Sequence, residues 1–330
     1  MFGRSKAKER VKYADFVGIF MVDALKAVSD SLSPWYQDGK FLKYTMVYFV
    51  LYLAMMGALF GAMFLIGQSN PALYQMFTNP SGTVDTELFF AGFMQFVVLF
   101  LIVLIPIMIV FSLVMGYVSM LMTLRGLEIS GLKTAKLGLV KVLKYFVLSF
   151  WLSILAFTSW KHDKFRLIFV GLVALWIAGV AAALMAPIIG ALVIVLAVIA
   201  SLIYVFIIWY NVLRLYPSYM VFLHKDQGIA ASADEGWSLS EGNALNIAIA
   251  FGVLIIGVIV AGFVLLIPRI IISVALAAVS APPVIDIGIS LLIDGALTAT
   301  MGAISALLGV NIYVQLLKEK GSAKTRTSIK

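Results

Sequence analysis

The chain has 330 residues, of which 63% are hydrophobic and 12% are charged, and its formal net charge is +8. Soluble globular proteins are about half apolar and about a quarter charged, so this composition excludes the soluble classes and indicates an integral membrane protein. The chain has no cysteine, which excludes disulfides and thiol chemistry. The alternating polarity of barrel strands is not seen, and we therefore expect transmembrane helices.

The first third of the chain predicts one surface helix and two crossings. Residues 11–32 repeat apolar positions every three or four residues, which predicts an amphipathic helix along the cytoplasmic interface. The first crossing is expected at about 43–67. The second is expected at about 88–124, roughly 55 Å at ~1.5 Å per residue. Because a hydrocarbon core is about 30 Å thick, this helix must project into the cytoplasm or bend near Pro106.

The middle of the chain predicts a second surface helix and two more crossings. We expect the surface helix at 132–160, by analogy with the first, while a shallow re-entrant or crossing segment is the alternative. The third and fourth crossings occupy 166–214 and are divided at Pro187.

The last third predicts a short surface helix at 228–236 and a fifth crossing at about 243–267. The segment 268–283 is expected at the outer interface, because it is too short to cross. The last crossing is expected at about 284–317, followed by a polar tail at 319–330.

A short signature precedes each pair of crossings: a tryptophan with an acidic residue three or four positions later. The three pairs are Trp35 with Asp38, Trp160 with Asp163, and Trp237 with Glu241. This periodicity predicts three repeats, at about 11–127, 132–225 and 228–320. The expected fold is an all-α integral membrane domain with six transmembrane helices in three parallel repeats. Each repeat is opened by a cytoplasmic amphipathic interfacial helix.

The basic residues indicate the orientation of the chain. With six crossings, Arg269 is the only one of the 24 lysines and arginines on the outer side. This positive-inside bias predicts an N-in, C-in protein of a prokaryotic plasma membrane. The basic excess is then an orientation signal, and no nucleic-acid partner is expected.

A family resemblance is sharpest over about 214–243, where the chain reads Arg214-Leu215-Tyr216, then 221–228 and 237–243 with Trp237 and Asn243. This pattern resembles the membrane-domain family of glycerophosphoryl diester phosphodiesterases and its bacterial and archaeal relatives. The resemblance implies a six-helix membrane domain with amphipathic connecting helices. It implies no phosphodiesterase activity here, because only a polar tail follows Lys318.

Asp294 is the sharpest candidate site residue, because an acidic group inside a crossing costs about 2.5–3.5 kcal/mol on insertion scales. Asp294 either binds a cation or relays protons, or it is neutralised by pairing with Arg269 or Thr298. Asp286 and the outer interface are within reach of the same region.

Three further groups of residues have structural and functional interpretations. Gly288, Gly295, Gly302 and Gly309 recur every seven residues and predict close helix packing, or a smooth wall for a lipid or solute. The signature tryptophans predict anchoring in the headgroup zone, and their acidic partners predict helix capping. Basic residues within about 140° of helical arc form either a solvated face or a docking face for anionic headgroups. These are Lys133, Lys136, Lys141 and Lys144.

The sequence therefore favours a non-enzymatic membrane module that organises lipids or docks a membrane-protein partner or a second copy of itself. The expected partners are anionic headgroups on the cytoplasmic side, without a cofactor. His162 and His224 lack a ligand-spaced neighbour, so no metal site is expected. A secondary transporter or channel using Asp294 is the first alternative. An enzyme acting on lipid headgroups is the second.

Overall fold

The computed structural model describes residues 24–69, 100–134, 136–280 and 282–327, together with residues 94, 97 and 98. These described residues fall into two compact units. Unit 1 holds residues 24–33, 123–255 and 307–327 of the described chain, and unit 2 holds residues 34–122 and 256–306. Residues 11–23 of the expected first surface helix and residues 88–93 of the second crossing lie outside the described residues.

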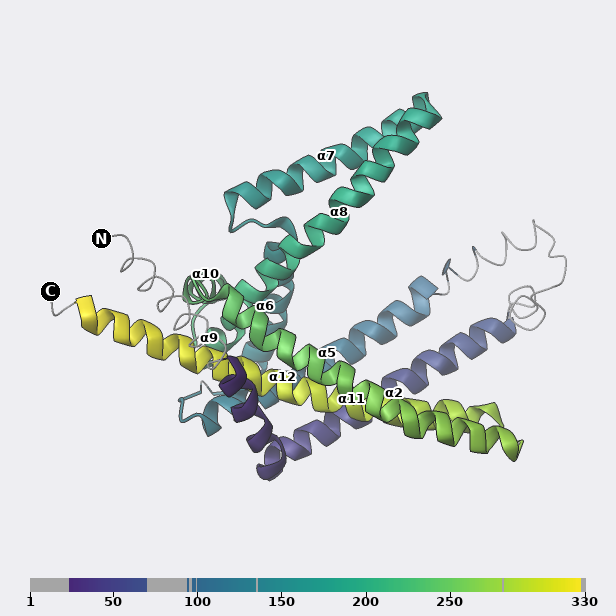
Figure 1. The fold of residues 1–330 in the computed structure, drawn as a ribbon, viewed down its shortest axis with the longest axis horizontal. Helices are drawn as coiled ribbons and strands as arrows, with labels where there is room; N and C mark the ends of the chain where they lie inside the picture. Colours follow the sequence, from purple (N-terminus) through teal and green to yellow (C-terminus); the bar gives the residue numbers. More distant parts are fainter. Residues whose placement is uncertain are drawn as a thin grey trace, which may run out of the picture. The chain divides into compact units, whose positions relative to one another are not determined.

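The described part of the chain is almost entirely helical and contains no strand (Figure 1). A helical segment covers residues 24–37. The further helices are α2 (Gly39–Ser69), α5 (Ile105–Ile129), α6 (Leu139–Thr158), α7 (Asp163–Met185), α8 (Pro187–Leu215), α9 (Pro217–Lys225), α10 (Ile229–Leu239), α11 (Ala244–Ala278) and α12 (Pro283–Thr327).

Seven of these helices, rather than the expected six, are long and apolar enough to cross a membrane. The chain is therefore a multi-pass membrane protein by the length and composition of its helices. The additional helix is α6, whose 20 residues match the length of one crossing. Its expected start at 132 was wrong, because the helix begins only at Leu139. Gly131 has φ 76° and Gly138 is extended, so the two glycines keep the intervening residues out of the helix.

The expected break after Ile267 was also wrong. Helix α11 continues through Pro268 to Ala278, so residues 268–278 do not form a separate interfacial segment. Proline removes one backbone hydrogen bond and crowds the preceding turn, but it does not have to end a helix. Apart from Arg269, the residues on both sides of Pro268 are largely apolar, and a helix is the conformation that satisfies their backbone in lipid.

The expected second crossing contains a π-helical turn close to Pro106, where a bend was one of the two expected ways to accommodate its length. A π-helix at Phe100–Leu104 leads directly into α5, and Pro106 is the second residue of α5. Proline has no N–H to donate to the preceding turn. A π-turn is a common way for a helix to accommodate such a local change in hydrogen bonding.

Unit 1 contains a helical hairpin of α7 and α8, which lie side by side (Figure 1). Pro187 opens α8 directly after the turn residue Ala186, which is the favoured helical position for proline. Near the turn the two backbones approach so closely that a Cβ on Gly190 would overlap the backbone of Ala183. Further along the hairpin, Trp176 Nε1 donates to Ser201 Oγ at 3.0 Å.

Helix α6 runs antiparallel to the second half of α8 and to α9. At one end, Asn211 of α8 donates from Nδ2 to the carbonyl oxygen of Ala156 at 3.0 Å. At the other end, Lys141 binds Asp226, the residue after α9, at 2.7 Å. Between them the ring of Tyr145 contacts those of Tyr219 and Phe222. Phe165, near the start of α7, contacts Tyr210 of α8. Most of α6 therefore packs against the part of α8 and α9 that follows Tyr210 in the chain.

Each tryptophan signature coincides with a break between two helices. The segment 24–37 ends just before Asp38, α6 ends before residues 159–162, and α10 ends before residues 240–243. A long apolar helix begins directly after each break. The signature therefore marks the start of a long apolar helix in each third of the chain.

Unit 2 contains the contact between α2 and α12. A Cβ on Gly295 would lie 3.0 Å from Tyr52 and 3.1 Å from Phe49, and Gly302 faces the ring of Tyr48. In unit 1, Gly309 lies against Tyr216 and Met220, whereas Gly288 has open space beside it. Three of the four heptad glycines thus lie at close helix contacts.

We predict that Gly190→Ala destabilises the protein by about 1–3 kcal/mol, because the new methyl group would meet backbone rather than a movable side chain. Gly171→Ala in the same hairpin is the matched control, since nothing lies within 4 Å of that position. The control should be neutral or slightly stabilising, because alanine has the higher helix propensity. Thermal unfolding in detergent measures both, and equal stability of the two variants would contradict the close approach.

Candidate functional site

Two polar side-chain pairs lie between α11 and α12 in unit 2. Arg269 Nη1 is 3.7 Å from Asp294 Oδ1, and the two side chains are 40% and 47% exposed. Four residues after Arg269, Ser273 Oγ donates to Asp286 Oδ1 at 2.6 Å. The structure therefore brings together Asp294 with Arg269, which was one of the predicted partners. Within the described part of the chain, Thr298 does not join the pair.

The position of Asp294 along α12 places the pair well inside an apolar stretch. Its neighbour Gly295 packs against Phe49, Tyr52 and Leu53 of α2. Those residues lie six to ten positions beyond Lys43, the last basic residue of α2. At ~1.5 Å per residue this is about 9–15 Å along the helix. A carboxylate at such a depth must be neutralised or hydrated, and Arg269 supplies the opposite charge.

In unit 1, ion pairs hold α6, α9 and α10 together. Lys141 binds Asp226, Lys161 binds Asp234, and Lys225 binds Glu235. Gln227 also donates to Glu235 at 2.9 Å. We refer to these three helices and the turns next to them as the α6/α9/α10 cluster. The pairs of Lys141 and Lys161 join α6 and the turn after it to residues more than 70 positions further along the chain, so they connect the elements of the cluster.

The four lysines predicted to share one face do not do so. Lys133 and Lys136 precede α6 and are not helical, so the expected helical arc is wrong. Lys141 is buried, and its Nζ also lies 5.4 Å from the centre of the Phe222 ring. Lys133, Lys136 and Lys144 are exposed and form no salt bridge with another described residue, although the charge of Lys144 also acts on Asp226. Of the four lysines, these three are the exposed ones.

The signature tryptophans have different surroundings. Trp160 is exposed, and the guanidinium of Arg166 lies 5.1 Å from its ring centre. Trp35 is half-buried, and its Nε1 has no hydrogen-bond partner within the described chain. Trp237 lies against Arg214, whose guanidinium is 3.9 Å from its ring centre. Trp160 therefore has the exposure expected of an interfacial anchor, whereas Trp237 forms part of an internal contact.

The acidic partners of these tryptophans lie at the starts of helices. Asp38 accepts a hydrogen bond from the backbone N–H of Phe41 at 2.8 Å, which caps α2. Asp163 is in the first turn of α7, where a negative charge offsets the partial positive charge of the helix N-terminus. Glu241 is exposed in the turn before α11.

Arg214 was missed as a structural residue by the sequence analysis, which counted it only as an orientation signal. It is buried, and its Nη2 donates to the carbonyl oxygen of Trp237 at 3.1 Å. Ser240 Oγ in turn donates to the carbonyl oxygen of Arg214 at 2.8 Å. These bonds attach the end of α8 to the end of α10. The signal in the sequence is that a basic residue follows leucine at the end of three apolar runs, in Leu124-Arg125, Leu213-Arg214 and Leu317-Lys318.

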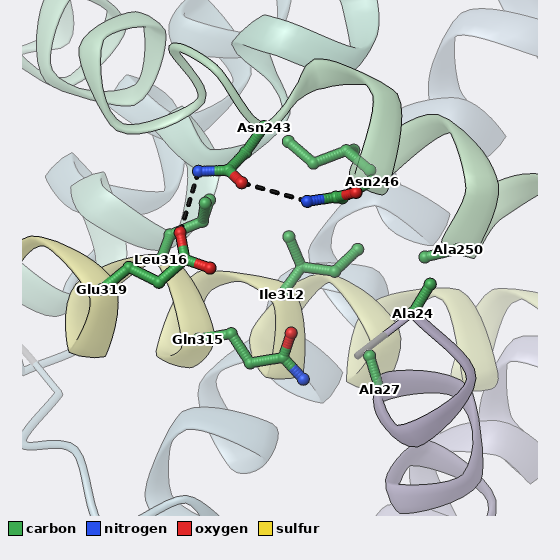
Figure 2. A pocket seen from close by; sticks show the side chains of 10 residues that line it. Ala24, Ala27, Asn243, Asn246, Ala250, Ile312, Gln315, Leu316 and Glu319 are labelled. Carbon is green, nitrogen blue, oxygen red and sulfur yellow. Dashed lines mark hydrogen bonds between the residues drawn. The ribbon is translucent and has the colours of Figure 1, made fainter. Parts of the chain in front are cut away.

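A small pocket of about 30 Å³ lies in unit 1 (Figure 2). This volume is enough for one or two water molecules. Asn243 donates to Glu319 at 2.9 Å and accepts from Asn246 at 3.1 Å on one side of it. Ala24, Ala27 and Ala250 contribute to its apolar side. The pocket has the size and polarity of a hydration site.

The histidines take part in local contacts. His224 Nδ1 is 2.8 Å from the hydroxyl of Tyr313, and His162 stacks on Phe165 with 4.2 Å between ring centres. Within the described residues, no group of three or more histidine, cysteine, aspartate or glutamate side chains could hold a metal ion.

No family model, curated protein or solved structure matches this chain. The resemblance to the phosphodiesterase membrane domains therefore remains an expectation from the sequence.

We predict that the Lys141–Asp226 pair loses its contribution to stability in acid. The hydrogen bond and the charge of Lys141 lower the pKa of Asp226 below its ordinary 3.8. The contribution is therefore full above the ordinary pKa and is lost as the pH falls through the lowered value. The difference in unfolding midpoint between wild type and Asp226→Asn should be constant near neutral pH and shrink below about pH 4.

The matched control is Glu241→Gln, which removes an exposed carboxylate that has no ion pair among the described residues. Its difference from wild type should stay small at every pH. An Asp226→Asn difference that grew in acid would contradict the pairing.

We predict an energetic coupling between Asp294 and Arg269. Asp294→Asn alone leaves a basic side chain without its partner, so it should destabilise the protein, and Arg269→Gln alone should do the same. The double variant should recover part of the loss, with a coupling of about 1 kcal/mol, as is usual for residues in contact. Unfolding in detergent measures the cycle, and additive single effects would show that the pair is not an interaction.

Proposed function

We propose that this protein is a non-catalytic, multi-pass module that organises the membrane by docking anionic lipids on its cytoplasmic side. The observation that carries the proposal is that the lysines in and before α6 differ in burial and in salt bridges. Lys141 is buried in a salt bridge, whereas Lys133, Lys136 and Lys144 are exposed and form no salt bridge within the described chain. Basic residues near a membrane surface attract anionic headgroups by about 1 kcal/mol each.

The lengths of the helices support six crossings, with α6 on the cytoplasmic side. Together α8 and α9 cover Pro187–Lys225, 39 residues. At ~1.5 Å per residue they are about 58 Å long, roughly twice the thickness of a hydrocarbon core. The more apolar part of this length is the section of α8 that pairs with α7 in the hairpin. We therefore place α7 and the paired section of α8 across the bilayer, and α6 beside the section that continues toward the cytoplasm.

This placement retains an N-in, C-in topology in the plasma membrane of a prokaryote. It also agrees with a threefold plan, since a surface-type helix precedes a crossing helix at each signature. The resemblance to phosphodiesterase membrane domains supports the same plan. A membrane-protein partner or a second copy of the chain would meet the protein on the same cytoplasmic side.

The outer surface of the α7–α8 hairpin supports the lipid-facing role. Large apolar side chains near its tip are almost fully exposed, with Leu184 at 85%, Met185 at 88% and Ile188 at 80%. Such side chains belong in hydrocarbon rather than in water. The described polar groups of unit 1 are used mainly in contacts between helices. The proposal therefore assigns recognition to the surface of the protein and not to an internal active site.

The test replaces the three exposed lysines, Lys133, Lys136 and Lys144, by glutamine. The loss of about 1 kcal/mol each predicts up to about 3 kcal/mol weaker anionic-lipid binding, or roughly 100-fold. Native mass spectrometry of gently solubilised protein counts the anionic lipids that are retained. It also detects protein partners and the oligomeric state in the same measurement.

The matched control is Lys141→Gln, which removes one positive charge from the same region. Because Lys141 is buried and paired, this change should lower stability but leave anionic-lipid retention unchanged. Equal lipid retention by wild type and the triple variant would overturn the proposed function.

A further inference from the structure

Helix α6 has two apolar faces, of which one is packed against the rest of unit 1 and the other is exposed, apart from the contact of Phe157 with α7. The packed face contains Tyr145, Leu148, Leu152 and Leu155, which are all buried against the unit. A second row of large apolar side chains is between 36% and 77% exposed. We call this row the α6 stripe: Leu139, Val140, Leu143, Val147, Phe150, Ile154 and Phe157.

The stripe is a continuous feature of the helix surface. Its members recur at intervals of three and four residues after Val140, so at 100° per residue the whole row lies within about 100° of arc. The packed face lies on the opposite side of the helix. A stripe of this length in contact with water would be an exposed apolar patch of the kind that marks an interaction site.

The stripe continues the lipid-facing surface of the α7–α8 hairpin. Phe157, at the end of α6, packs edge-on against Phe169 of α7 with 5.6 Å between ring centres. Beside this contact, Leu167 and Ile168 of α7 are exposed on the hairpin. Lipid that covers this part of the hairpin therefore also reaches Phe157 of the stripe.

The charges beside the stripe favour phospholipid over a second copy of the chain. Helix α6 contains no acidic residue, and the exposed Lys144 is at the edge of the stripe. A two-fold dimer through the stripe would bring Lys144 of both copies to one interface, where the stripe itself supplies no carboxylate. A leaflet offers acyl chains to the stripe and phosphates to the lysine.

We infer that α6 is inserted at a slope into the cytoplasmic leaflet, with acyl chains of phospholipids bound along the α6 stripe. The helix enters deepest at Ile154 and Phe157, next to the hairpin, and rises to the membrane surface at Leu139. This inference deepens the proposed function, because it identifies the membrane-binding element. Its test rests on the insertion of the apolar stripe and not on the binding of headgroups by the lysines.

The absence of native cysteine allows a direct depth measurement. Val140→Cys, Val147→Cys and Ile154→Cys each place one fluorophore on the stripe of the full chain, reconstituted in phosphatidylcholine vesicles. Phospholipids with bromine at different positions along the acyl chain quench each fluorophore according to its depth. Ile177→Cys on the exposed face of α7 is the deep control, and Lys133→Cys is the surface control.

We expect quenching to fall steadily from Ile154 through Val147 to Val140, with all three shallower than Ile177 and deeper than Lys133. Maximal depth at Val147, equal to that at Ile177, would show that α6 crosses the bilayer and would overturn the inference. A stripe that is not quenched while Ile177 is quenched would overturn it as well. In that case, cross-linking between two Val147→Cys copies would identify a dimer.

The uncharged vesicles separate this inference from the proposed function. A steady depth gradient in phosphatidylcholine supports insertion of the stripe, whatever the lysine variants do. Anionic-lipid retention that is unaffected by the triple lysine change would then refute headgroup docking alone. Loss of the gradient with normal lysine-dependent retention would refute insertion alone.

Discussion

The thickness of the bilayer constrains this protein more than any single contact. A hydrocarbon core of about 30 Å accommodates about 20 helical residues, whereas α11 has 35 and α12 has 45. Each such helix must tilt, bend or extend into the headgroups. In unit 1 the continuous apolar length Pro187–Lys225 has 39 residues. The end of α8 and the whole of α9 contact α6 and α10, so the α6/α9/α10 cluster packs along one end of this length.

Backbone groups at the helix ends impose the next requirement, because the last carbonyls of a helix have no partner within it. At the end of α6, Asn211 binds the carbonyl oxygen of Ala156 and Tyr204 binds that of Phe157. Asn311 of α12 is half-buried and donates to the carbonyl oxygen of Ala27, which lies within the segment 24–37 and not at its end. An asparagine of a long apolar helix thus contacts a second helical segment in both places, but only at α6 does it bind a helix-end carbonyl.

The sequence predicted features that depend on local composition. Hydropathy indicated the apolar helices, Pro187 indicated the hairpin turn, and Asp38 indicated a helix cap. It did not predict that α11 continues through Pro268, because proline is compatible with both a kink and a stop. It also gave no sign that Arg214 would lie on Trp237 at 3.9 Å. That contact depends on how α8 and α10 pack, which no local pattern encodes.

The lysines show that a positive charge can have one effect during membrane insertion and another in the folded protein. The topology is set while the helices enter the membrane, and at that stage Lys141 and Lys144 contribute the same positive charge. After folding, Lys141 binds Asp226, which lies 85 residues further along the chain, and its charge is no longer available to a lipid. A count of basic residues therefore predicts orientation well and overestimates attraction to anionic headgroups. The exposed and unpaired lysines, rather than the total charge of +8, set the strength of that attraction.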